Sequence, residues 1–123
     1  MEKICLDFDA ALDFLRGEPT TIEKLKYYAD KEELCISSFV FLQLLGSVSK
    51  NQAVMAFANS VTVLPFDRRS AQIAANIIKE TDPEESIKKM ESILIAAICI
   101  ANDAFLFSRT FAKFDGIKGL RKV

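Results

Sequence analysis

Residues 3–9, with the sequence KICLDFD, decide how the rest of the chain is interpreted. The first six of them predict a short strand, because Ile4 and Leu6 fall on one face when side chains alternate along a strand. Asp7 and Asp9 lie at the carboxyl end of this strand. A largely apolar strand that ends in two acidic side chains therefore gives the starting point for predicting both fold and site.

The remainder of the chain repeats the order of a strand followed by one or two helices. Further strands are predicted at residues 34–37, 61–65 and 104–107, with a short edge strand within 118–123. Helices are predicted at residues 10–16, 21–30, 39–49, 51–58, 68–79 and 83–101. This order is typical of an α/β fold, here a three-layer α/β/α sandwich with a central parallel sheet of four to five strands.

Polar residues at three helix starts support these boundaries. Asp67 and Asp82 are placed to cap the helices that follow them, and Asp82 is followed by Pro83 at the first helical position. Thr20 and Glu23 have the spacing of a capping box for the second helix. These three predicted helix starts thus have a chemical reason as well as an apolar pattern.

The composition limits the classes of function. A length of 123 residues is typical of one domain, so residues 1–123 are predicted to form a single domain. The net charge of −1 gives no global attraction to nucleic acid, so any contact with nucleic acid must be local. The chain has no histidine, so carboxylates must supply any acid, base or metal chemistry.

Cellular location is predicted from three features. The longest apolar stretch, residues 93–101, is much shorter than the about 20 residues that a membrane span needs. The amino terminus has no signal-peptide pattern. The three cysteines lie in apolar runs and are predicted to be buried, reduced side chains. A cytoplasmic location without membrane contact is the expectation.

The acidic residues after the first strand are candidates for metal binding. In a parallel sheet, ligands gather at the carboxyl ends of the strands, where Asp7 and Asp9 could share a hard cation such as Mg²⁺. Asp9 could instead act as the N-cap of a helix that begins at Ala10. Asp13, one turn further on, is either part of this site or a solvated surface residue.

Several segments together resemble the PIN domain family, in particular its VapC-type members. The opening ICLDFD followed by LDFLRG resembles the first strand and helix of that family. Further segments that match it are ISS at 36–38, LLG at 44–46, LIAA at 94–97, FSRT at 107–110, KF at 113–114 and IKGL at 117–120. The resemblance covers the whole chain.

This resemblance implies an endoribonuclease that depends on Mg²⁺ or Mn²⁺, in which a cluster of acids holds the metal and a metal-activated water attacks a phosphodiester. It also implies RNA as substrate, a small antitoxin as partner of a toxin, and a homodimer. A cation could perform this chemistry without histidine, because it lowers the pKa of bound water and neutralises phosphate charge.

The family has four acidic positions, of which this sequence keeps the first as Asp7. The other three correspond, in chain order, to Gln43, to Ser92 with Glu91 beside it, and to Thr110 or Lys113, with Asp115 slightly beyond. The resemblance thus makes Asp7, Gln43, Glu91 and Ser92 candidate catalytic residues, and Asp7 and Asp9 candidate metal ligands. Each neutral replacement removes charge that a divalent cation needs, so weakened cleavage is expected.

Three basic residues are candidates for contacts with RNA phosphates: Arg16, Arg109 and Lys113. They would make one part of the surface positively charged, although the net charge of the whole chain is −1. The alternative for each of them is an ordinary solvated surface charge.

Two rival functions remain open from the sequence. A degenerate PIN-like module could act by binding protein or RNA, since Gln43 and Ser92 replace acids. A phosphatase similar to the haloacid dehalogenases could use Asp7 as nucleophile, with Ser37 or Ser38 as the second motif. The later acidic pair of that second family is not evident in this sequence.

Overall fold

The computed structural model describes residues 1–123 and has one sheet of five parallel strands. The strands are β1 (Lys3–Leu6), β2 (Glu33–Ser37), β3 (Thr62–Leu64), β4 (Ala104–Phe107) and β5 (Arg121–Lys122), in the spatial order β3-β2-β1-β4-β5. Every neighbouring pair is parallel. The predicted α/β class and the parallel sheet are confirmed.

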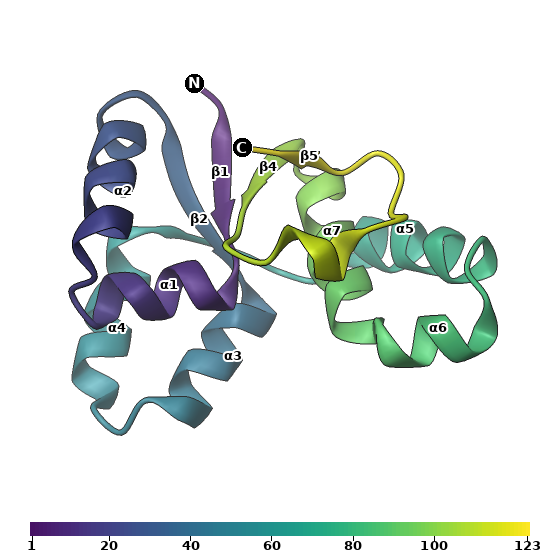
Figure 1. Cartoon of the computed structure of the whole chain (residues 1–123), viewed down its shortest axis with the longest axis horizontal. Coiled ribbons are helices and arrows are strands. Elements are labelled where there is room, and N and C mark those ends of the chain that lie inside the picture. Colours follow the sequence, from purple (N-terminus) through teal and green to yellow (C-terminus); the bar gives the residue numbers. More distant parts are fainter.

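Seven α-helices and one short 3₁₀ helix surround this sheet. They are α1 (Phe8–Leu15), α2 (Pro19–Lys31), α3 (Ser38–Ser47), α4 (Asn51–Ser60), α5 (Arg68–Lys79), α6 (Pro83–Lys88), α7 (Met90–Ala101) and η1 (Phe111–Phe114). Figure 1 shows α1 to α4 grouped on one side of the sheet and α5 to α7 on the other, which is the predicted three-layer arrangement. None of these helices combines the length and apolar character needed to cross a bilayer.

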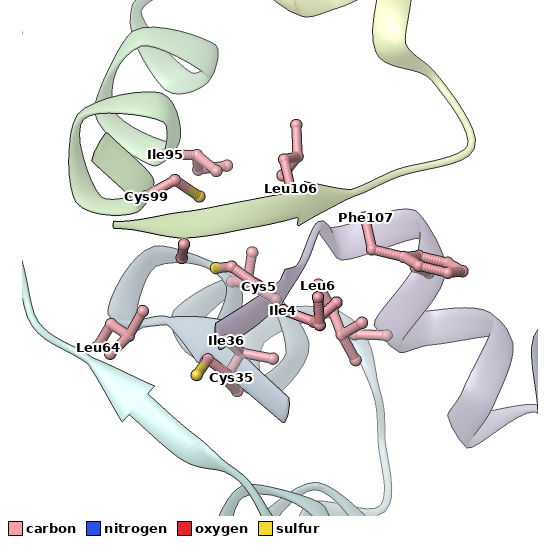
Figure 2. Packing of buried hydrophobic residues seen from close by; sticks show 14 of the residues in the cluster. Ile4, Cys5, Leu6, Cys35, Ile36, Leu64, Ile95, Cys99, Leu106 and Phe107 are labelled. Atoms are coloured by element: carbon pink, nitrogen blue, oxygen red, sulfur yellow. The ribbon is translucent and has the colours of Figure 1, made fainter. Parts of the chain in front are cut away.

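The core lies on both faces of the sheet because the central strands are apolar on both faces. Leu106 of β4 lies on the α7 side of the sheet with Ile95 and Cys99, as Figure 2 shows. Phe107 points to the other layer, where its ring meets the Tyr28 ring of α2 edge to face, at 6.0 Å between centroids. The three cysteines are buried and unpaired, as predicted.

The helix starts confirm two of the predicted caps and correct two. The Asp67 carboxylate accepts from the Ser70 N–H at 2.9 Å, as expected for α5. The Asp82 carboxylate likewise caps α6. The predicted capping box at the start of α2 is wrong, because α2 begins at Pro19 and the Glu18 carboxylate accepts from the N–H groups of its first turn.

The first helix begins two residues earlier than predicted, and this moves the cap. Asp7, not Asp9, is the N-cap of α1, and its side chain accepts from the Phe8 N–H at 2.8 Å. The strand ends at Leu6 because the capping residue must leave the sheet to start the helix. Asp9 therefore lies in the first helical turn.

The predicted helix over residues 83–101 is two helices, α6 and α7, with Lys89 between them. The sequence changes at this point from a charged segment to an almost wholly apolar one. Ile87 of α6 remains exposed, whereas Ile93 and most of α7 are buried. The break lets α7 enter the core while α6 stays on the surface.

The chain order of the strands creates a switch point between β1 and β4. From β1 the chain first moves through β2 and β3 on one side, and it returns to β4 on the other side. Connections leave the carboxyl ends of β1 and β4 in opposite directions, which opens a crevice at such a point. The Asp7 N–H donates to the Phe107 carbonyl at 2.9 Å, so Asp7 and Ser108 emerge side by side at this edge.

Candidate active site at the ends of strands β1 and β4

Asp7 is the centre of the site and is fully buried. One carboxylate oxygen, Oδ1, accepts from the Phe8 N–H as the cap of α1. The other, Oδ2, accepts from the Ser108 hydroxyl at 3.0 Å and lies 2.8 Å from the Lys113 ammonium nitrogen. A buried carboxylate needs such compensation, since burying it unpaired would cost several kcal/mol.

Asp9 lies next to this pair and binds the turn after β4. Its Oδ2 atom accepts from the Arg109 N–H at 3.1 Å and from the Thr110 hydroxyl at 2.8 Å. The Ser108 hydroxyl oxygen is also 3.3 Å from Asp9 Oδ2, although its single proton can serve only one acid at a time. Asp9 thus ties the first turn of α1 to the segment that carries Lys113.

Asp13 belongs to the same edge and is not the solvated residue that one interpretation predicted. Its side chain is largely buried, and the Arg109 Nε atom lies 2.7 Å from its Oδ2 atom. The Thr21 hydroxyl of α2 donates to the same oxygen at 3.3 Å. Asp7, Asp9 and Asp13 therefore form a row along α1, and donors from the segment after β4 contact each of them.

Gln43, Glu91 and Ser92 lie on α3 and α7. The Gln43 amide nitrogen donates to the Glu91 carboxylate at 2.5 Å, which joins two helices far apart in sequence. The other amide atom of Gln43, Oε1, is buried without a hydrogen-bond partner. Ser92 is buried, whereas Glu91 is exposed. The structure joins Gln43 and Glu91 directly, and neither of them forms a hydrogen bond or ion pair with Asp7.

The three basic candidates differ in their surroundings. Arg16 is exposed and follows α1 as its C-cap. The Arg109 side chain is 60% exposed despite its contact with Asp13. The Lys113 side chain is 36% exposed, and its ammonium group is paired with Asp7. Arg109 and Lys113 thus lie at the same edge as the acids. Arg109 forms an ion pair with Asp13, and Lys113 forms one with Asp7.

A groove of about 800 Å³ opens beside Arg109 and Asp13. Its walls come from α2, from the end of β4 and from the segment that follows, and they include the rings of Tyr27, Tyr28 and Phe111. The groove carries acids as well as bases, so it is not a uniformly basic channel. The ion pair between Arg109 and Asp13 forms part of its wall.

The donor set does not fit the divalent cation that the resemblance implies. Mg²⁺ and Mn²⁺ need several oxygen ligands, and carboxylates supply the required charge. No three Asp, Glu or Cys side chains come together where they could hold a metal ion. Asp7 is fully buried, both of its carboxylate oxygens accept hydrogen bonds, and its charge is already balanced by Lys113. Asp9 likewise accepts hydrogen bonds at both carboxylate oxygens.

The position of Asp7 follows from the strand pattern of the sequence, whereas its hydrogen-bond and ion-pair partners do not. Ser108 was not a candidate, although the parallel pairing of β1 and β4 places the residue after β4 beside Asp7. Lys113 was a candidate for phosphate contact, but its partner is Asp7. The signal for that pairing was its position, because Lys113 is one of the two residues, with Thr110, that the resemblance places near the family's fourth acid. A lysine opposite a retained acid predicts an ion pair.

The cysteine on β1 shares the buried surroundings of Asp7. A hydrogen bond with the Cys99 side chain, together with burial, raises the pKa of the Cys5 thiol well above its ordinary value. Burial raises the pKa of Cys35 to about 12. These thiols therefore stay protonated and do not act as nucleophiles in the site.

Comparison with known proteins identifies relatives over most of the chain. The PIN domain family model matches residues 4–112. Ribonuclease VapC3 from Methanocaldococcus jannaschii is 30% identical over 93 residues, which are 76% of this chain and 94% of that protein.

Solved structures share the fold at lower sequence identity. A chain of the VapBC2 crystal structure from Rickettsia felis, bound to a DNA fragment from its promoter, superimposes with a TM-score of 0.81 at 19% identity, covering 98% of this chain and 97% of that one. A chain of DNA-bound VapBC from Salmonella typhimurium gives 0.76 at 20% identity, covering 100% and 98%. With the family model matched over nearly the whole sequence, this chain belongs to the PIN domain family.

Proposed function

We propose that this chain is a VapC-like toxin of the PIN domain family, an endoribonuclease whose cleavage is weak and whose partner is an antitoxin. The observation that carries this proposal is the similarity to a VapC ribonuclease over 94% of the length of that protein. The same similarity favours the ribonuclease over the degenerate binding module, and the match to the PIN domain model gives no support to a phosphatase.

The edge formed by Asp7, Ser108 and Arg109 is the proposed place for RNA. Arg109 uses only Nε towards Asp13, so the other guanidinium N–H groups are free to donate to a phosphate. Lys113 uses one contact towards Asp7 and has further donors on an ammonium group whose side chain is partly exposed. Arg16 lies at the end of α1 and adds an exposed positive charge.

Weak cleavage is proposed because of the acid positions. Ribonucleases of this class generally depend on a divalent metal, which supplies an activated water and neutralises phosphate charge. In this chain Gln43 and Ser92 are neutral, and Glu91 accepts from Gln43. The Asp7 carboxylate forms an ion pair at the edge of the sheet, and the positive partner in this chain is the Lys113 ammonium group.

The proposed protein partner is an antitoxin of the kind found in VapBC complexes. The support is that chains from several such complexes share this fold over nearly their whole length. A homodimer and a cytoplasmic location belong to the same proposal. Induced expression of this chain in a bacterial host should slow growth, and co-expression of its antitoxin should relieve the effect.

An RNA cleavage assay tests the catalytic part of the proposal. Purified protein is incubated for hours with a labelled mixed RNA pool at millimolar Mn²⁺, beside the Asp7→Asn and Asp103→Asn variants. We expect slow cleavage that is lost in Asp7→Asn, because a neutral amide cannot form the ion pair that holds the Lys113 ammonium group at this position. Asp103 is an exposed acid on the far end of the sheet, so Asp103→Asn should cleave like the wild type. Intact RNA in every reaction would refute the ribonuclease.

A further inference from the structure

The charge balance around Asp7 leads to an inference that goes beyond the proposed function. Asp7 carries one negative charge, and the Lys113 ammonium group carries one positive charge 2.8 Å away. The pair is neutral, and the side chain of Asp7 has no contact with solvent. A divalent cation at this place would add two positive charges beside a carboxylate whose charge Lys113 already balances, which a buried environment disfavours.

The neighbouring acids cannot supply the missing charge without losing their own contacts. Asp9 Oδ2 already accepts from a backbone N–H and from the Thr110 hydroxyl. Asp13 is paired with Arg109 at 2.7 Å. Asp7 and Asp13 are therefore balanced by positive side chains, and Asp9 keeps its negative charge but accepts hydrogen bonds from neutral donors at both carboxylate oxygens.

Gln43 and Ser92, which correspond to two of the family's acid positions, are neutral, and the Glu91 carboxylate beside Ser92 accepts a hydrogen bond from Gln43. Gln43 offers one buried amide oxygen without a partner, and Ser92 offers a hydroxyl group. Neutral oxygens can complete the shell of a divalent cation, but they do not balance its charge. The oxygen atoms around Asp7 therefore favour a cation with one positive charge over a divalent one, and the Lys113 ammonium group is that cation.

We propose that the Lys113 ammonium group is the resident cation of this site and takes the place of a divalent metal ion. Lys113 is one of the two residues, with Thr110, that the family resemblance places near the fourth acid position, and a lysine there would supply a positive charge where the family has an acid. Asp7 then serves to hold Lys113 at the edge of the sheet. The wild-type protein consequently has no affinity for Mg²⁺ or Mn²⁺ at physiological concentrations of these ions.

The test is titration with MnCl₂ by calorimetry, together with thermal unfolding with and without MnCl₂ at matched ionic strength. Three proteins are compared: the wild type, Lys113→Asp and Lys118→Asp. Lys118 is an exposed lysine nearby, so Lys118→Asp changes the net charge by the same amount without touching Asp7. We expect no saturable binding up to about 1 mM Mn²⁺ for the wild type and Lys118→Asp. Lys113→Asp should gain saturable binding and a higher unfolding temperature in Mn²⁺.

Two results would overturn the inference. One is saturable Mn²⁺ binding by the wild type that is lost in Asp7→Asn. The other is a Lys113→Asp protein that gains no binding. If Lys113→Asp fails to fold without metal, Lys113→Gln replaces it, and the same gain relative to the wild type is required. No RNA is used, so this inference and the proposed ribonuclease fail independently.

Discussion

Lys113 Nζ lies 2.8 Å from Asp7 Oδ2, and this contact joins the end of strand β1 to the 3₁₀ helix η1, 106 residues later in the chain. The Asp7 side chain is fully buried, whereas that of Lys113 is 36% exposed. The pair is therefore half enclosed, so it is stronger than a surface ion pair and accessible to ligand from one side.

Removal of the Lys113 charge should destabilise the fold. Lys113→Met keeps most of the length of the side chain but leaves the Asp7 carboxylate buried without its counter-charge. We expect a loss of about 2 kcal/mol in the free energy of unfolding, below the about 3–5 kcal/mol for breaking a fully buried pair, because the Lys113 side chain is 36% exposed. Urea unfolding measures it. Lys118→Met is the control and should change stability by less than about 0.5 kcal/mol.

RNA binding should not depend on divalent ions. If Lys113 and Arg109 provide the positive charge at the edge, the dissociation constant for a labelled RNA measured by fluorescence anisotropy should be the same in EDTA and in Mg²⁺ at matched ionic strength. Arg109→Ala should weaken binding and reduce the slope of log K against log salt by about one. Tighter binding in Mg²⁺ by a factor of ten would contradict this prediction.

The cap of helix α5 should make stability depend on acid pH. Hydrogen bonds from the Ser70 backbone and hydroxyl lower the pKa of Asp67 from its ordinary value of 3.8. The folded state therefore favours the ionised form, and this stabilisation is present above about pH 4 and is lost as the pH falls through the lowered pKa. Asp67→Ala should lower the unfolding midpoint at pH 7, and the difference from wild type should shrink towards pH 2.

The matched control for this cap is Asp67→Asn. An asparagine can accept the same hydrogen bonds but has no charge to titrate. It should retain most of the stability at pH 7 and lack the acid-dependent part. If Asp67→Ala and the wild type differ equally at pH 7 and pH 2, the titration of Asp67 does not contribute.

The cysteines should resist alkylation in the folded protein. All three are buried and so are shielded from a reagent in solution, and burial also raises the pKa of Cys35 to about 12, so that thiol has almost no thiolate form at pH 8. A thiol reagent should label none of the three in the native protein and all three in denaturant, as counted by mass spectrometry. Rapid labelling of the native protein would show that the core around Cys5 and Cys99 opens more readily than this packing implies.

The sheet could be predicted from the sequence because its strands are short apolar runs separated by capped helices. Asp67 and Asp82 were recognised as caps, since each precedes an amphipathic or proline-led helix. The break at Lys89 was not predicted, because apolar periodicity continues through it and only tertiary packing separates α6 from α7. The start of α1 was shifted for a related reason, as Asp7 and Asp9 are both plausible caps.

The place of Asp7 directly after β1 could be predicted from the sequence, and its role in a functional site stays a prediction. Asp7 at the end of β1 follows from the strand pattern, because carboxyl ends of parallel strands meet at one edge. The partners could not be derived in this way. Contacts such as Ser108 to Asp7 and Gln43 to Glu91 join residues 101 and 48 positions apart, and they depend on how the layers pack. The family resemblance located Lys113 but could not show which carboxylate it contacts.

A crystal structure grown in millimolar MnCl₂, with data collected at the manganese absorption edge, tests the central claim most directly. We predict no anomalous peak within coordination distance of Asp7, and density for the Lys113 side chain in contact with Asp7 Oδ2. An anomalous peak beside Asp7, with Lys113 turned away to solvent, would contradict the account.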